Sequence, residues 1–140
     1  CFWSTSSGGV NRAEWTLSES NIDLVILGLG ANDMLRGIRP KETKNNLEKI
    51  IKTVQDKNIE LILAGMIAPT SYGNEYKRNF DKIYPDLSKQ YNLPLIPFLL
   101  KGVALKPDLN LSDGIHPNEK GIIIISKTLQ EIILKNISSN

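Results

Sequence analysis

Apolar residues along the chain alternate between short continuous runs and longer helical stripes. The runs Ile22–Gly30 (IDLVILGLG) and Ile59–Ile67 (IELILAGMI) are rich in leucine and β-branched residues at successive positions. Such runs are typical of parallel strands that are buried on both faces. A third and shorter run, around Leu95–Phe98, predicts a third strand.

The segments between and after these runs have helical periodicity. From about Pro40 to Lys57 one face of a predicted helix carries Leu47, Ile50, Ile51 and Val54. A second stripe consists of Tyr76, Phe80, Ile83, Tyr84 and Leu87. Pro85 should bend that helix or restart it, because proline lacks the amide hydrogen of the helical ladder. A last helix, from about Asn118, should turn inward Ile122, Ile125, Leu129, Ile132 and Ile133.

This alternation of strand and helix predicts an α/β fold with a parallel sheet and helices on both faces. With 140 residues, the chain has the length of one domain, residues 1–140. In such folds reactive groups collect on the loops that follow the carboxyl ends of the strands.

Composition excludes several function classes. Hydrophobic residues make up 41% and charged residues 23%, as in ordinary globular proteins. The net charge of +2 and the absence of a basic run argue against nucleic acid as a partner. Neither a run of 18 apolar residues nor a signal-peptide pattern is present, so we expect no membrane span.

The single cysteine, Cys1, allows no internal disulfide and leaves the compartment open. A cysteine at residue 1 is compatible with the lipidated start of a mature bacterial lipoprotein. We favour a truncated fragment instead, because organised sequence begins at once, without a flexible tether.

The only histidine, His116, follows Asp113 by three residues in the stretch DGIHPNEKG. A histidine works best as a general base when a carboxylate accepts a hydrogen bond from Nδ1, so that Nε2 can take a proton from a nucleophile. Gly114 would let the loop curl and Pro117 would stiffen its exit. The alternative is that Asp113 caps a turn and His116 is a surface residue. One histidine without a cysteine cluster makes a metal site a weaker interpretation.

A second candidate block, LGLGANDMLRG, follows the first predicted strand and contains Gly30, Asn32 and Asp33. A side-chain amide at the carboxyl end of a strand can donate to a developing oxyanion. The alternative is a tight turn, in which these residue types are common. Dinucleotide binding is disfavoured because the G-x-G-x-x-G pattern is incomplete and no P-loop lysine follows.

Together and in this order, the G-x-N-D block and the D-x-x-H block resemble the SGNH (GDSL-type) hydrolase superfamily. Four further stretches resemble its bacterial acyl-CoA thioesterase I, lysophospholipase and arylesterase branch: LRGIRP, APTSYGNEYKRNFDKIYPDL, LPLIPF and LKPDLNLSDGIHPNEKG. The resemblance extends from about Thr5 to Ile133. It implies a flavodoxin-like three-layer α/β/α sandwich that needs no cofactor and no metal.

The resemblance also implies roles for individual residues. Asp113 and His116 would be the acid and the base of a Ser-His-Asp triad. Asn32 would be an oxyanion-hole donor, and Gly30 would supply the close backbone approach that the block needs. The substrate loop that shapes the acyl pocket would comprise Ile67, Ala68, Pro69, Thr70, Ser71 and Tyr72. The substrate would be a small acyl ester or thioester, and a periplasmic or secreted location is suggested by resemblance only.

The chain departs from the family pattern near its start. It contains no Gly-Asp-Ser segment, and Trp3 stands where the family has an oxyanion glycine. We therefore expect the first strand or strands of the domain and the nucleophilic serine to be missing. Ser4, Ser6 and Ser7 are interpreted as loop serines.

Two hypotheses follow from this departure. In the first, the chain holds the catalytic half of an ester or thioester hydrolase whose nucleophile lies upstream, so it should be nearly inert by itself and have exposed strand edges. In the second, it is an inactive relative that binds acyl ligands. Acyl chain length, the preference between ester and thioester, and the oligomeric state are left open by the sequence.

Overall fold

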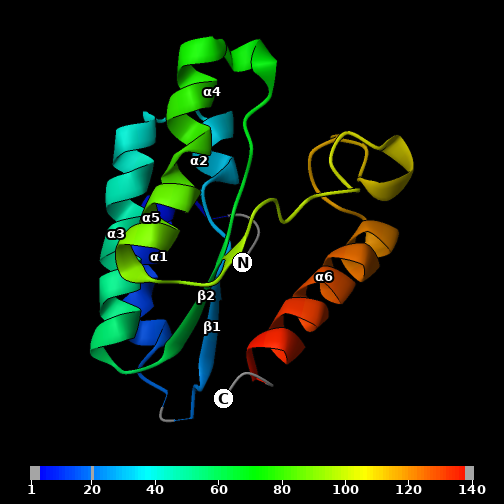
Figure 1. Cartoon of the computed structure of the whole chain (residues 1–140). Coiled ribbons are helices and arrows are strands. Elements are labelled where there is room, and N and C mark those ends of the chain that lie inside the picture. The colour runs from blue at the N-terminus through cyan, green and yellow to red at the C-terminus, as the bar shows by residue number, and fades with distance from the viewer. Residues whose placement is uncertain (1–3, 20, 138–140) are drawn as a thin grey trace. The chain divides into compact units, whose positions relative to one another are not determined.

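The computed structural model describes residues 4–19 and 21–137, so Cys1 and Trp3 lie outside the described residues. The chain divides into two compact units, which meet in sequence between Pro97 and Phe98. The expected single-domain organisation stays a prediction. The first unit contains α1 (Ser6–Thr16), β1 (Leu24–Leu27), α2 (Ala31–Leu35), α3 (Pro40–Asp56), β2 (Glu60–Ala64), η1 (Thr70–Tyr72), α4 (Asn74–Asp81), α5 (Ile83–Tyr91) and β3 (Leu95–Ile96). The second contains η2 (Pro107–Leu109) and α6 (Glu119–Ile137) (Figure 1).

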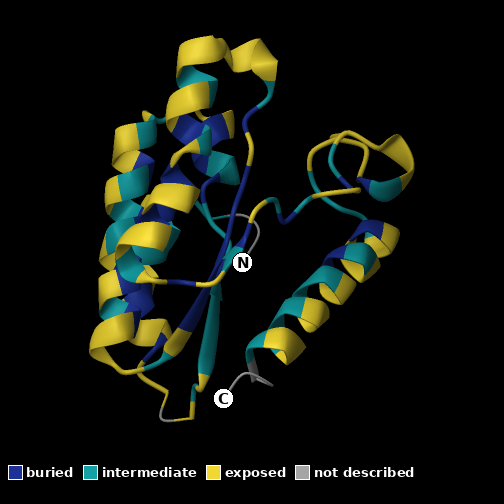
Figure 2. Cartoon of the chain, viewed as in Figure 1, coloured by how far each residue is buried: buried dark blue, intermediate teal, exposed yellow. Residues whose placement is uncertain are grey.

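The three strands form a parallel sheet in the order β1-β2-β3, which confirms the predicted strands and their direction. Val25 is paired with Leu61, and Leu63 with Leu95. The central strand β2 is buried from Leu61 to Ala64, as its continuous apolar run predicts (Figure 2). The β1 residues Leu24–Ile26 are half-buried, because β1 is an edge strand of this sheet.

Helices α3 and α5 pack against the sheet with the predicted apolar stripes. The four stripe residues of α3 are all buried, and so are Phe80, Ile83, Tyr84 and Leu87. The predicted restart at Pro85 is confirmed, since α4 ends at Asp81 and α5 begins at Ile83. Pro85 cannot donate to the carbonyl of Asp81, so the helical ladder is interrupted at that carbonyl.

Helix α1 corrects the interpretation of the serines near the start. Ser6 and Ser7 form its first turn, and the Thr5 hydroxyl caps it by accepting a hydrogen bond from the Gly8 amide at 3.2 Å. The expectation of loop serines is therefore wrong for Ser6 and Ser7. The adjacent glycines, Gly8 and Gly9, lower the helical propensity of the segment, so the sequence pattern does not predict this helix. Packing of α1 on α3 supplies what propensity does not.

In the second unit α6 starts within one residue of the predicted position, because Asn118 caps it with a hydrogen bond from the Gly121 amide (3.1 Å) to Oδ1. Ile125 is buried as predicted, at 3% exposure, but Ile122 is 45% exposed and was wrongly placed inward. Gly121 lies on the buried face of α6, since a side chain there would overlap the Leu109 carbonyl oxygen. Ile122 lies about 100° further around the helix. No helix in the described part of the chain is long and apolar enough to cross a bilayer.

A glycine just after β2 provides a test of this packing. A Cβ on Gly65 would lie 2.5 Å from the Pro97 carbonyl oxygen and 2.9 Å from that of Ile96. We expect Gly65→Ala to lower the free energy of unfolding by about 1–3 kcal/mol, because the obstacle is backbone. The matched control, Gly8→Ala in α1, should raise it by about 0.5–1 kcal/mol, because its Cβ meets only ordinary contacts. Urea unfolding of both variants measures the difference, and equal effects would contradict the packing.

Candidate active site

Asp113 holds His116 through a turn built from their own backbone. The Asp113 Oδ1 accepts hydrogen bonds from the amides of Ile115 (2.9 Å) and His116 (3.0 Å). Its Oδ2 lies 2.7 Å from Nδ1 of His116. Gly114 adopts a φ of +70°, a left-handed conformation that favours glycine. The Asp113 carboxylate therefore caps the turn and also contacts the imidazole ring.

The loop that carries this pair is fastened on both sides. The amide of Leu111 donates to the His116 carbonyl at 2.7 Å, just ahead of the short bridge between Asn110 and Pro117. The buried Asn110 side chain donates to the carbonyls of Val103 (2.9 Å) and Lys106 (2.7 Å). Sequence reasoning missed Asn110, although an asparagine between loop and turn residues is a frequent hydrogen-bonding element.

Asp113 and His116 differ in the exposure of their side chains. The His116 side chain is 15% exposed and the Asp113 side chain is 40% exposed. Hydrogen bonds from the Ile115 amide, then from the His116 amide and ring, lower the pKa of Asp113 to about 2. Asp113 is therefore ionised at neutral pH and can stabilise an imidazolium at His116.

The G-x-N-D block lies in the first unit, at the end of β1 and the start of α2. Gly30 precedes α2 with a φ of +119°, and a Cβ there would overlap the Tyr84 hydroxyl. Gly30 is thus required both by its backbone conformation and by a close approach, here by a side chain. The half-buried Asn32 donates through Nδ2 to the Ser4 carbonyl oxygen at 3.3 Å.

Asp33, the next residue, is completely buried. Its Oδ1 accepts the Ser6 amide at 2.7 Å, and its Oδ2 accepts the hydroxyls of Ser6 and Thr43, the latter at 2.9 Å. The Ser6 Oγ in turn accepts from Nδ2 of Asn46 at 3.0 Å. Sequence reasoning singled out Asp33 only as a turn residue and missed its partners Ser6 and Thr43, because they lie 27 and 10 residues away along the chain.

Tyr84 fastens the other side of the block. Its hydroxyl donates to the Leu29 carbonyl at 2.8 Å. Burial, followed by the nearby charge of Asp33, raises the pKa of Tyr84 far above its ordinary value, so the hydroxyl keeps its proton. Tyr84 ends a column of aromatic rings at helical spacing, with centroids 5.5 to 5.9 Å apart, that consists of Tyr72, Tyr76, Phe80 and Tyr84.

The predicted substrate loop, Ile67–Tyr72, leaves the sheet after β2 and is anchored at Ala68. The buried Ala68 donates its amide to Oδ1 of Asp81 at 2.8 Å and accepts Nζ of Lys77 at 2.7 Å. Ile67 is exposed, Pro69 is half-buried, and Thr70, Ser71 and Tyr72 form the exposed turn η1. The loop therefore has a fixed base at Ala68 and an exposed apolar surface at Ile67 and Tyr72.

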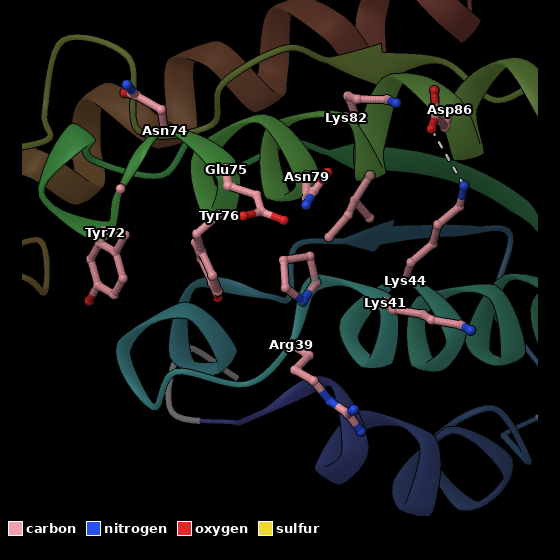
Figure 3. A pocket seen from close by; sticks show the side chains of 13 residues that line it. Arg39, Lys41, Lys44, Tyr72, Asn74, Glu75, Tyr76, Asn79, Lys82 and Asp86 are labelled. Carbon is pink, nitrogen blue, oxygen red and sulfur yellow. Dashed lines mark hydrogen bonds and ion pairs between the residues drawn. The ribbon is translucent and has the colours of Figure 1, made fainter.

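A cavity of about 830 Å³ opens between the start of α3 and helices α4 and α5 (Figure 3). Tyr72 is the one predicted site residue that lines it. Charged side chains around it are Arg39, Lys41, Lys44, Lys82, Glu75 and Asp86. Two of the cations are paired, Arg39 with Glu42 at 2.6 Å and Lys44 with Asp86 at 3.4 Å. These solvated pairs give the cavity a polar lining on that side.

The predicted site residues thus form two sets. Asp113 and His116 are in direct contact in the second unit, whereas Gly30, Asn32 and the substrate loop belong to the first. Within residues 4–19 and 21–137, no three His, Cys, Asp or Glu side chains gather as metal ligands would.

Comparison with known proteins identifies the family. A family model of GDSL-like lipases and acylhydrolases matches residues 3–122. The chain belongs to this family. Thioesterase 1/protease 1/lysophospholipase L1 of Escherichia coli K12 is 40% identical over 114 residues, which are 81% of the chain and 55% of that protein. The arylesterase of Vibrio mimicus is 33% identical over 95% of the chain and 66% of its own length. The chain thus spans about half to two thirds of these curated relatives.

Solved structures confirm the fold class. The crystal structure of TesA matches 94% of the chain and 73% of its own, with a TM-score of 0.86 and 30% identity. The esterase EstA from Pseudoalteromonas sp. matches 96% and 74%, with a TM-score of 0.89 and 31% identity. These neighbours, together with the parallel sheet, establish the predicted three-layer α/β/α fold class of SGNH hydrolases.

The pKa of Asp113 makes a prediction for pH dependence. Because the folded-state pKa (about 2) lies below the ordinary value of 3.8, the turn contributes stability that is fully present above about pH 4. That contribution should be lost as the pH falls toward 2. The difference in unfolding free energy between the wild-type chain and Asp113→Asn should therefore be constant from pH 5 to about 4 and shrink below it. Denaturant unfolding at several pH values measures it, and a difference that does not change with pH would contradict the assignment.

Proposed function

We propose that the natural protein containing this sequence is a serine hydrolase that cleaves acyl esters or thioesters. The observation that carries the proposal is the contact of 2.7 Å between Asp113 and Nδ1 of His116, in a chain that belongs to the acylhydrolase family. His116 is the general base, Asp113 orients and stabilises it, and Asn32 donates to the oxyanion. The nucleophilic serine comes from outside these 140 residues, which contain no Gly-Asp-Ser.

The proposed reaction has two halves. The serine Oγ attacks the acyl carbonyl while His116 takes its proton, and the Asn32 amide stabilises the negative charge on the carbonyl oxygen. The alcohol or thiol then leaves with the proton from His116, and an acyl-enzyme remains. Water attacks the acyl-enzyme with His116 again as the base, which releases the acid and restores the serine.

Support for an acyl substrate comes from the loop and from the relatives. Ile67 and Tyr72 present exposed apolar surface next to the fixed Ala68, as a surface for an acyl chain requires. The names of the relatives, a thioesterase and lysophospholipase, an arylesterase and an esterase, share the hydrolysis of ester or thioester bonds. We therefore propose arylesters, acyl-CoA or lysophospholipids as the substrate class.

A fluorophosphonate probe tests the mechanism. We expect the protein purified from its natural source to gain the mass of one adduct, and His116→Ala to lower both labelling and esterase turnover by about a million-fold. Intact-mass spectrometry and hydrolysis of a p-nitrophenyl ester measure the two effects. An unlabelled protein that binds fatty-acyl ligands saturably without turnover would instead establish the inactive binding relative. Unchanged turnover in His116→Ala would refute the role of the histidine.

The role of Asn32 makes a separate prediction. Asn32→Ala should lower kcat by about 10²–10³ with little change in KM, because the lost hydrogen bond strengthens only as the oxyanion forms. Asn45→Ala is the matched control, since Asn45 is an exposed residue of α3. Steady-state kinetics on one ester substrate compare the two variants, and a similar kcat for both would remove Asn32 from the mechanism.

A further inference from the structure

We infer that Asp33 is a positioning residue, whose buried carboxylate fixes the orientation of the Asn32 amide. This inference rests on the proposed function, in which Asn32 donates to the oxyanion. Asp33 itself is completely buried and acts on Asn32 through the backbone of α2 and through the start of α1.

Residues from the starts of three helices meet at the Asp33 carboxylate. Asp33 lies in the first turn of α2, and it accepts the amide of Ser6, the first residue of α1. Thr43, whose hydroxyl also donates to Asp33, lies near the start of α3. The start of α1 thus contributes a backbone amide to the carboxylate, and the start of α3 contributes a side-chain hydroxyl.

The burial of this group has a cost that its partners must offset. A carboxylate removed from water is strongly destabilising unless hydrogen bonds replace its hydration. The donors here are neutral: the Ser6 amide and the hydroxyls of Ser6 and Thr43. The direction of the Ser6 hydroxyl is itself set by Asn46, which donates to the same oxygen. An apolar residue would avoid this cost, so the carboxylate is better explained by what it orients than by stability.

The hydrogen bonds of Asp33 restrict the position of Asn32 in two ways. Asn32 and Asp33 are neighbours in a helix of five residues, so a shift of one moves the other. Asn32 also donates to the Ser4 carbonyl, two residues before the Ser6 that Asp33 holds. The segments 4–6 and 32–33 are therefore joined at both ends, and the bond to Ser4 fixes the plane of the Asn32 amide. Opening the Asp33 end would let that plane rotate.

A double-mutant cycle in the full-length natural protein tests the inference. Asp33→Asn keeps the shape but places an amide against donors, and we expect it to lower kcat about a hundredfold or less with KM nearly unchanged, as a misplaced group does. In the Asn32→Ala background, Asp33→Asn should cause no further loss of kcat, because its effect passes through Asn32. Asp23→Asn, at an exposed position, is the matched control.

Thr43 supplies a second pair of variants that keeps the test valid if Asp33→Asn fails to fold. Thr43→Val removes one donor to the carboxylate and should lower kcat, whereas Thr43→Ser keeps the hydroxyl and should restore it. A loss of kcat that is the same in both Asn32 backgrounds would overturn the positioning role alone. An Asn32→Ala variant with full activity would overturn the proposed oxyanion donor and the positioning role together. A loss confined to the Asn32 background would support both.

Discussion

The buried carboxylate of Asp33 joins the stability of the first unit to the geometry of its proposed site. Its donors come from α1 and α3, and the residue itself stands in α2 beside Asn32. Because an unsatisfied buried carboxylate is far more costly than an exposed one, these three helix starts must converge whenever the unit is folded. The same convergence fixes the Asn32 amide, so the orientation of this proposed oxyanion donor depends on the packing of the core.

On the other side of the G-x-N-D block, the Tyr84 hydroxyl holds the turn that precedes α2. Tyr84 donates to the carbonyl of Leu29 and leaves space only for glycine at position 30. Its ring packs edge-on to Phe80 at 5.9 Å, so the turn before α2 is tied to α4 and α5. The short helix α2, which could not be stable by itself, is thereby held just before its start, at Leu29 and Gly30, and in its first turn, at Asp33.

The sequence could predict what local patterns determine. The strands, the stripe of α3 and the restart before Pro85 follow from periodicity and proline chemistry, and the turn of Asp113 and His116 follows from residues three apart. Helix α1 was not predicted because two glycines weaken its helical propensity. The contact of Ser6 was not predicted because its partner, Asp33, is 27 residues away in the sequence. Ile122 was placed inward because periodicity alone does not reveal that Gly121, a residue without a side chain, lies on the buried face of α6.

The two carboxylates of the proposed mechanism therefore depend on the fold to different degrees. Asp113 is exposed and bonded to amides two and three residues later, so its grip on His116 is formed by the loop itself. Asp33 is bonded to Ser6 and Thr43, 27 and 10 residues away, and can hold Asn32 only when these distant helices have packed. Loosening of the first unit should consequently weaken the oxyanion donor before it disturbs the base. In such a state the general base would still be oriented, but the charge on the carbonyl oxygen would no longer be stabilised.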